Sequence, residues 1–199
     1  MRPDQWVRGW KPSKLTREEA LVEVARRYLH TYGPASHEHF GAWWGVAPAR
    51  GRKVFRELGD ELVEVDLAGE PASVLATDLP GIESARMPAG HLRLLPHFDP
   101  YKIGVRPRDM FVERRHYDRV FLKAGWMSPV VLREGRAVGV WAASKGAART
   151  TITVEPFGRF DRPTLRAIER EADRLGPFLG AGAVEVVVGP VPRQRGAAA

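Results

Sequence analysis

The chain has 199 residues, of which 44% are hydrophobic and 28% are charged, so it can form one large domain or two small ones. It contains no cysteine, which excludes disulfides and thiolate metal sites and fits a reducing cytoplasm. No apolar run approaches the roughly 20 residues of a membrane span, and residues 1–14 lack the apolar core of a signal peptide. We therefore expect a cytoplasmic protein that does not contact a membrane.

The net charge of +7 and the isoelectric point near 10.1 favour a polyanionic partner. The charge is unevenly distributed along the chain. Residues 1–76 carry 11 basic and 11 acidic side chains, whereas residues 77–199 carry 20 basic and 13 acidic ones. The same numbers also describe an ordinary solvated surface of an arginine-rich protein, so charge alone does not decide the function.

The first 76 residues show the pattern of a small DNA-binding domain. Thr16 and Glu19 form a capping-box sequence, Ser36 is a good N-cap, and Gly45–Ala47 is a link of the length found in a helix-turn-helix. Three helices are expected at 17–32, 37–44 and 48–58, and two strands at 62–67 and 72–76. Three helices followed by a hairpin predict a winged helix-turn-helix domain at 12–76.

Residues 77–90 are rich in proline, glycine and serine and are expected to form a linker. Beyond them, strands are expected at 91–95, 129–133, 136–141, 150–155 and 183–188, and helices at 107–121 and 162–175. The strands are mostly joined by hairpins, which predicts a mixed, mainly antiparallel and small barrel-like β-rich domain at 91–190. The fold class is therefore α+β, and residues 191–199 are expected to be a disordered tail.

The helix expected at 48–58 carries the first candidate site. Arg50, Arg52, Lys53 and Arg56 surround its apolar positions, and the third helix of a winged helix enters the major groove of DNA. Arginine and lysine side chains there reach phosphates or guanine acceptors. The alternative is a solvated helix surface, and Gly51 lowers the intrinsic helix propensity of this segment.

The segment 94–109 carries the second candidate site. Asp99 and Arg106 are possible substrate-proximal residues, because a carboxylate placed between an aromatic residue and a proline can orient a water molecule or read an amine. It can equally pair with Arg106 in a structural role. Arg114 and Arg115 follow among aromatic residues, a pattern that is able to track a nucleic-acid backbone and that also suits a solvated face.

Motifs for metal, nucleotide or nucleophilic chemistry are missing from the sequence. His37 and His39 are two residues apart and would point to different faces of a helix, and His97 with Asp99 lacks a third ligand. Neither a phosphate-binding loop nor a nucleophile elbow is present. No metal site and no cofactor are expected.

The run LLPHFDPYKIGVRPR at 94–108 resembles the P-F-D segment of the AlkZ/YcaQ-like family of winged-helix proteins. The later run REGRAVGVWAASKGAARTTITVEPF resembles the G-x-x-V-G-x-W hairpin of that family and the strand after it, and HFGAWWGV resembles an internal winged-helix segment. The resemblance covers about residues 5–190, and its motifs follow one another in the same order as in the C-terminal half of a full-length member. It implies tandem winged helices followed by a small β-barrel, together with DNA binding.

In the active branch, the resemblance also implies excision of alkylated or crosslinked purines by a Gln-x-Gln or Gln-x-Asp motif in the N-terminal half. The two glutamines here, Gln5 and Gln194, are in neither pattern, and there is no asparagine, so no catalytic residue is expected. The leading hypothesis is a protein that binds double-stranded DNA without autonomous catalysis. The alternatives are a DNA glycosylase that needs a separate N-terminal winged-helix half, and a protein-interaction module that uses Trp43 and Trp44.

Overall fold

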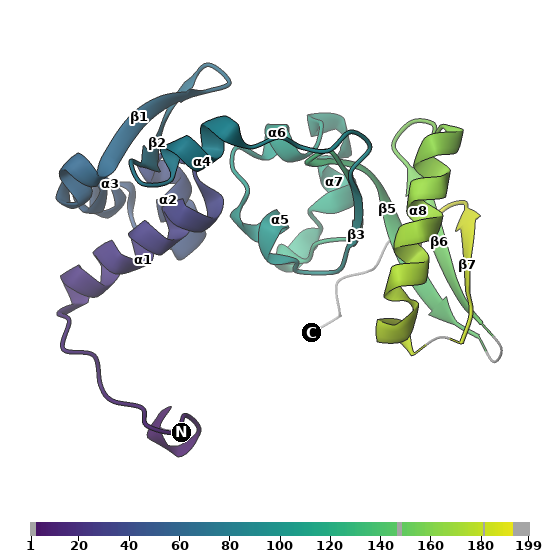
Figure 1. The fold of residues 1–199 in the computed structure, drawn as a ribbon, viewed down its shortest axis with the longest axis horizontal. Coiled ribbons are helices and arrows are strands. Elements are labelled where there is room, and N and C mark those ends of the chain that lie inside the picture. Colours follow the sequence, from purple (N-terminus) through teal and green to yellow (C-terminus); the bar gives the residue numbers. More distant parts are fainter. Residues whose placement is uncertain (1–2, 147–148, 181, 193–199) are drawn as a thin grey trace. The chain divides into compact units, whose positions relative to one another are not determined.

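The computed structural model describes residues 3–146, 149–180 and 182–192. The chain forms two compact units, an N-terminal unit at 1–84 and a C-terminal unit at 85–199. The fold is of the α+β class, as the sequence predicts. In the N-terminal unit the structure has the elements η1 (Pro3–Gln5), α1 (Arg17–Tyr32), α2 (His37–Trp44), α3 (Pro48–Leu58), η2 (Gly59–Glu61), β1 (Leu62–Leu67), β2 (Glu70–Leu75) and α4 (Leu79–Ser84) (Figure 1).

The first three α-helices of this unit, α1, α2 and α3, begin and end at the residues that the sequence indicates. The Thr16 hydroxyl accepts a hydrogen bond from the Glu19 backbone N–H, and the Glu19 carboxylate accepts one from the Thr16 N–H, which completes a capping box at the start of α1. Ser36 and His39 do the same for α2. Gly45 ends α2 in the left-handed conformation, which costs a glycine little.

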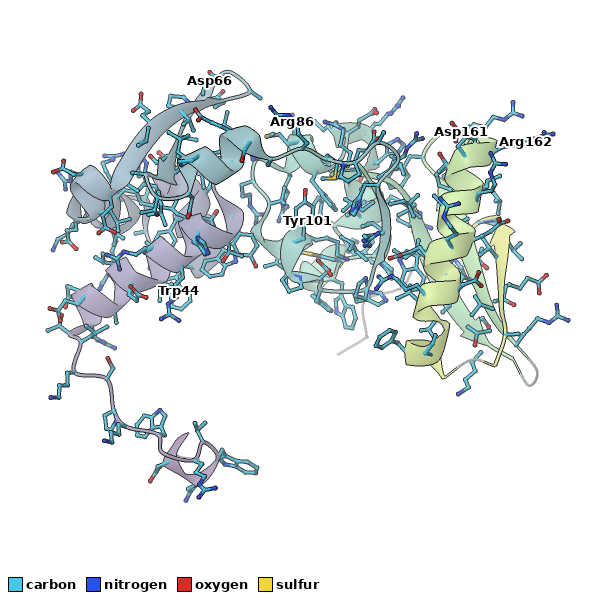
Figure 2. The ribbon with its side chains drawn as sticks, in the orientation of Figure 1. Trp44, Asp66, Arg86, Tyr101, Asp161 and Arg162 are labelled. Carbon is cyan, nitrogen blue, oxygen red and sulfur yellow. The ribbon has the colours of Figure 1, made fainter. Side chains whose placement is uncertain are left out.

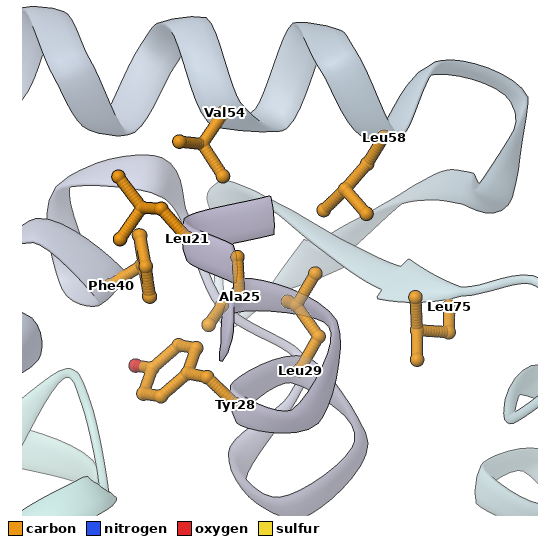
Figure 3. Packing of buried hydrophobic residues seen from close by; sticks show 9 residues of the cluster. Leu21, Ala25, Tyr28, Leu29, Phe40, Val54, Leu58 and Leu75 are labelled. Atoms are coloured by element: carbon orange, nitrogen blue, oxygen red, sulfur yellow. The ribbon is translucent and has the colours of Figure 1, made fainter. Parts of the chain in front are cut away.

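The core of the N-terminal unit lies where α1, α2, α3 and β2 meet (Figure 3). Burial of a leucine or phenylalanine side chain contributes about 1.5–3 kcal/mol, so this cluster holds the helices together. Its buried members are Leu21, Ala25, Tyr28, Leu29, Ala35, Phe40, Val54, Leu58 and Leu75. An antiparallel bridge between Ala35 and Ser73 ties the chain before α2 to the β1–β2 hairpin.

Gly51 explains how α3 comes close to α2. A Cβ atom at this position would lie 2.7 Å from the backbone oxygen of His37, closer than side chains are found. The residue that lowers the helix propensity of α3 is therefore the one that permits the close approach of the two helices. Gly51 is buried along with Val54 and Leu58, so the inner side of α3 is defined by these three positions.

The C-terminal unit contains a five-stranded sheet in the order β3-β4-β5-β6-β7 among the described residues. Its first four strands pair antiparallel, whereas β7 pairs parallel to β6 after the crossover helix α8. The elements of the C-terminal unit are β3 (Leu92–Leu95), α5 (Pro100–Gly104), α6 (Arg108–Phe111), η3 (Arg114–His116), α7 (Tyr117–Val120), η4 (Lys123–Gly125), β4 (Val130–Arg133), β5 (Arg136–Lys145), β6 (Thr150–Pro156), α8 (Arg162–Leu175), η5 (Gly176–Leu179) and β7 (Val184–Val188).

The mixed, mainly antiparallel sheet agrees with the expectation from the sequence, but the barrel-like closure does not. Within the described ranges the edge strands β3 and β7 do not pair with each other, so the sheet is open. The physical reason is that both faces are already covered. Val131 and Trp141 face a core with Ile168 of α8, while their neighbours Val130 and Val140 face a second core on the other side.

Two further expectations need correction. The helix expected at 107–121 is divided into α6, η3 and α7, because extended backbone at Val112 and Glu113 lets both Phe111 and Val112 enter the core. The segment 77–90, expected as a linker, contains α4 and also the boundary between the two units, after Ser84. Val191, expected in a disordered tail, is buried against the sheet, and residues 193–199 of that tail lie outside the described residues.

No helix in the described part of the chain combines the length and the apolar character needed to cross a membrane.

Candidate nucleic-acid interface

The outward face of α3 is basic. Successive residues of a helix are rotated by about 100°, so Arg52, Lys53 and Arg56 lie opposite the inner side formed by Gly51, Val54 and Leu58. All three basic side chains are exposed. Arg50 projects instead toward α1, where its guanidinium is 3.4 Å from a carboxylate oxygen of Glu18. The structure therefore brings three of the four predicted residues of this helix together and directs the fourth to one side.

The three outward side chains differ in their partners. Arg52 donates from Nε to the His37 Nε2 atom at 3.2 Å, and the Lys53 ammonium is 3.6 Å from Glu57 on the same helix. Arg56 has no hydrogen bond or ion pair with any residue that the structure describes. Exposed pairs such as Lys53–Glu57 contribute little stability, so these cations remain available to an anionic partner.

The β1–β2 hairpin has the opposite charge. Seven carboxylates occur between residues 57 and 78, and the first basic residue after Arg56 is Arg86. Glu64, Asp66 and Glu70 are exposed on the hairpin, and Figure 2 shows Asp66 on it. Such a hairpin repels phosphates, whereas the outward face of α3 attracts them.

In the C-terminal unit, the predicted residues Asp99 and Arg106 lie at opposite ends of the short helix α5. The Asp99 carboxylate caps the helix by accepting a hydrogen bond from the Tyr101 N–H at 2.9 Å. The Arg106 guanidinium donates to the backbone oxygens of Ile103 and Val105, which belong to the other end. Each of these residues therefore binds backbone at its own end of α5.

Lys102 lies inside the same helix and was not singled out by sequence reasoning. Its side chain is only 1% exposed, and its ammonium donates to the Ser128 backbone oxygen at 2.8 Å. Burial lowers the pKa of Lys102 to about 8, and the negative charge of Asp99 acts in the opposite direction. Lysine is seldom fully buried, so Lys102 is easily recognised in the structure. The sequence gives no signal for its burial, because its carbonyl partner is distant in the chain.

An aromatic cluster surrounds the turn that leads to Asp99. The ring centroids of Phe98 and Trp126 are 5.1 Å apart, and His97 donates from Nδ1–H to the Met127 backbone oxygen at 2.8 Å. His97 is thus bound to backbone. No group of three residues suited to hold a metal ion occurs in the part of the chain that the structure describes.

Arg114 and Arg115 are highly exposed and already have acidic neighbours. Arg114 is 3.9 Å from Asp109, and Arg115 is 2.8 Å from Glu113. Arg115 also lines a cavity, together with other arginines.

Helix α8 carries a second row of basic residues that the sequence reasoning missed. Arg162, Arg166 and Arg170 recur every fourth residue on its exposed side, and Figure 2 shows Arg162 at the beginning of the helix beside its cap Asp161. The fourth member of the row, Arg174, is held by Glu171. The repeat at four-residue spacing was the available signal, since such residues share one face of a helix.

The chain is similar to known DNA-repair proteins. A family model described as "DNA glycosylase AlkZ-like" matches residues 2–178. An interstrand DNA cross-link repair glycosylase from Streptomyces sahachiroi is 36% identical over 173 residues, which cover 85% of this chain and 45% of that protein. The solved structure of the S. sahachiroi DNA glycosylase AlkZ matches with a TM-score of 0.80 at 32% identity, covering 93% of this chain and 49% of that one. The chain therefore spans about half the length of the relatives it matches.

Proposed function

Because the chain belongs to the family of AlkZ-like DNA glycosylases, we propose that it binds double-stranded DNA through the outward face of α3. The observation that carries the proposal is the exposed set Arg52, Lys53 and Arg56, opposite the buried side of the helix. Each phosphate that such a cation neutralises releases a counterion, which drives binding without reading sequence. The arginine row on α8 provides a further basic surface on the C-terminal unit.

We assign the N-terminal unit to the winged helix-turn-helix class as part of this proposal. The order of α1, the Ala35 bridge, α2, α3 and the β1–β2 hairpin supports it. In that class the third helix enters the major groove. The acidic hairpin stays away from phosphates, so α3 makes the principal contact of this unit.

We further propose that these 199 residues bind DNA without excising a base on their own. Base excision requires groups that hold an extruded nucleotide and position a water molecule. The Gln-x-Gln or Gln-x-Asp pair implied by the family resemblance does not occur in the sequence. Glycosylase activity would then require the N-terminal winged-helix half that the alternative hypothesis names.

A second candidate function, binding of another protein, rests on Trp44. Its side chain is 48% exposed and borders a groove between α1 and α2 that also contains Val24 and Val46. Trp43, the other residue of this hypothesis, is partly buried and packs against the core, with its ring centroid 4.9 Å from that of Tyr28. Trp44 is therefore the more exposed of the two tryptophans.

Fluorescence anisotropy with a labelled DNA duplex tests the proposed function. We expect affinity that varies little with sequence and falls steeply between about 50 and 200 mM salt, because phosphate contacts dominate it. The absence of binding at 50 mM salt would refute the proposal and favour the protein-binding candidate.

A further inference from the structure

The C-terminal unit contains a cavity of about 430 Å³ that none of the functions above uses. This volume is within the roughly 300–1,000 Å³ of small-molecule sites. Three segments distant in sequence form its walls: the η3 turn, the β4–β5 hairpin, and the chain from the end of β6 into α8. Its lining residues are Glu113, Arg115, His116, Arg133, Glu134, Arg136, Ala137, Val138, Phe157, Gly158, Arg159, Phe160 and Thr164.

One part of the lining is strongly basic, with four arginines against two glutamates. Both glutamates already have partners: Glu113 is 2.8 Å from Arg115, and Glu134 accepts a hydrogen bond from the Gly90 N–H. Arg136 donates only to the backbone oxygen of Asp109, at 3.3 Å. Arg159 has no ion pair or hydrogen bond with any described residue. Neither Arg136 nor Arg159 forms an ion pair with a described residue, and the lining keeps a net positive charge although the Glu134 carboxylate, bonded only to a backbone N–H, offsets part of it.

The other part of the lining is apolar and aromatic. Ala137, Val138, Phe157 and Phe160 contribute to it. The His116 ring stacks on Phe157, with centroids 4.2 Å apart and planes 8° from parallel. A ligand that suits this mixed lining carries both an anionic group and a flat, weakly polar ring.

We propose that this cavity binds one nucleotide of unpaired DNA, with its phosphate held by Arg136 and Arg159 and its base against the apolar wall. Guanidinium groups bind phosphate through paired, charge-assisted hydrogen bonds. Aromatic side chains stack on any base, so the site discriminates little between sequences. A duplex presents its bases stacked and paired, whereas an unstacked nucleotide has the size and shape to enter a concave site.

The inference shares with the proposed function only the assumption that DNA is the ligand. The α3 surface is convex and suits a duplex, and the cavity is in the other unit and suits a single strand. The two proposals therefore fail independently, one in duplex binding and one in single-strand binding.

Nuclear magnetic resonance of the full chain locates the site. Titration with thymidine 5′-monophosphate is expected to give saturable shifts of the amides of Ala137, Gly158 and Arg159, and thymidine without the phosphate is expected to give much smaller ones. Inorganic phosphate that shifts the same amides equally well would identify a simple anion site and overturn the nucleotide assignment. Shifts confined to α3, or none, would overturn the proposal entirely.

Binding of a fluorescein-labelled oligothymidine strand tests the two arginines. The double variant Arg136→Ala with Arg159→Ala is expected to lose at least about tenfold in affinity, since two charge-assisted contacts are removed. The control, Lys123→Ala with Arg149→Ala, removes the same charge from exposed positions of the same unit outside the cavity and is expected to lose less than about threefold. Equal losses in both variants would show a general charge effect and refute the site.

Discussion

At the scale of single residues, the segment around α5 is organised by backbone contacts. Asp99 caps one end of the helix, Arg106 binds oxygens at the other, and Lys102 between them donates to Ser128. Asp99 and Arg106 thus bind the two ends of α5, and Lys102 ties the helix to the turn that precedes β4. A role in positioning is consistent with all three, and none of these contacts requires a substrate.

The buried ammonium of Lys102 predicts an unusual dependence of stability on pH. The unfolded chain keeps this proton up to its ordinary pKa of 10.5, whereas the folded chain releases it near pH 8. Between these values the unfolded state binds more protons, so the free energy of unfolding rises with pH, by up to about 3 kcal/mol. Below pH 8 this contribution is absent, because both states are protonated.

Urea unfolding at pH 7.5 and pH 9.5 measures the effect. The wild-type chain is expected to unfold at a higher urea concentration at pH 9.5, and Lys102→Met is expected to lose most of that difference. An equal rise in the variant would assign the pH dependence to other groups. The burial of Lys102 was not predictable from its neighbours in sequence, because it depends on Ser128, which is 26 residues away.

At the scale of elements, α3 is the part whose role is most directly testable. Replacing Arg52 and Arg56 with alanine is expected to weaken duplex binding by about tenfold at 50 mM salt and to lower the salt slope by up to about one unit per lost phosphate contact. Both residues are exposed, so the variant is expected to fold. The matched control is Arg17→Ala with Arg27→Ala on α1. An unchanged affinity in the α3 variant would show that this helix does not lie on DNA.

The acidic hairpin gives a prediction of opposite sign. Glu64→Gln with Asp66→Asn removes two exposed negative charges and is expected to strengthen duplex binding by about threefold or less at 50 mM salt. The gain is expected to disappear near 200 mM, where the screening length falls below about 8 Å, because the effect acts through space. A gain that persists at high salt would contradict this and place the hairpin in contact with DNA. The comparison uses the same anisotropy titrations.

The elements that sequence predicts well are those with local signals. Thr16 and Ser36 mark helix starts because each caps backbone atoms within three residues. The helix expected at 107–121 failed for a tertiary reason, since Phe111 and Val112 both enter the core and need extended backbone between them and η3. The candidate surfaces also differ in whether local sequence signals predict them. The outward face of α3 follows from helical spacing, whereas the cavity joins segments that only the fold brings together.

At the scale of the whole molecule, the net charge lies in one part of the chain, whereas the similarity to relatives extends over both units. The net charge of +7 resides in residues 77–199, while the basic helix α3 belongs to an N-terminal region whose charge balances. The proposal for α3 therefore rests on the position of its cations on the helix and not on total charge. The relatives share the fold of both units, over about half of their own length.

The final prediction concerns catalysis by the purified 199-residue chain. We expect no detectable release of an alkylated purine from duplex DNA, because loss of a preorganised catalytic group commonly costs a hundredfold or more in rate and the implied glutamine pair is absent. Asp99 is the carboxylate in the family-like segment, and it is engaged in capping α5. The assay is a single-turnover reaction with excess protein, followed by alkaline cleavage of abasic sites.

Asp99→Asn is the informative variant for this assay, because asparagine also caps helices well and the change removes only the charge. Product formed by the wild-type chain and lost in Asp99→Asn, with the thermal unfolding midpoint unchanged, would make Asp99 catalytic and overturn the prediction. Product that survives the substitution would place catalysis at another site of this chain. If neither chain forms product, the N-terminal half of a relative is added as a separate polypeptide. The hypothesis of DNA binding without autonomous catalysis predicts that alkylated purines are then released.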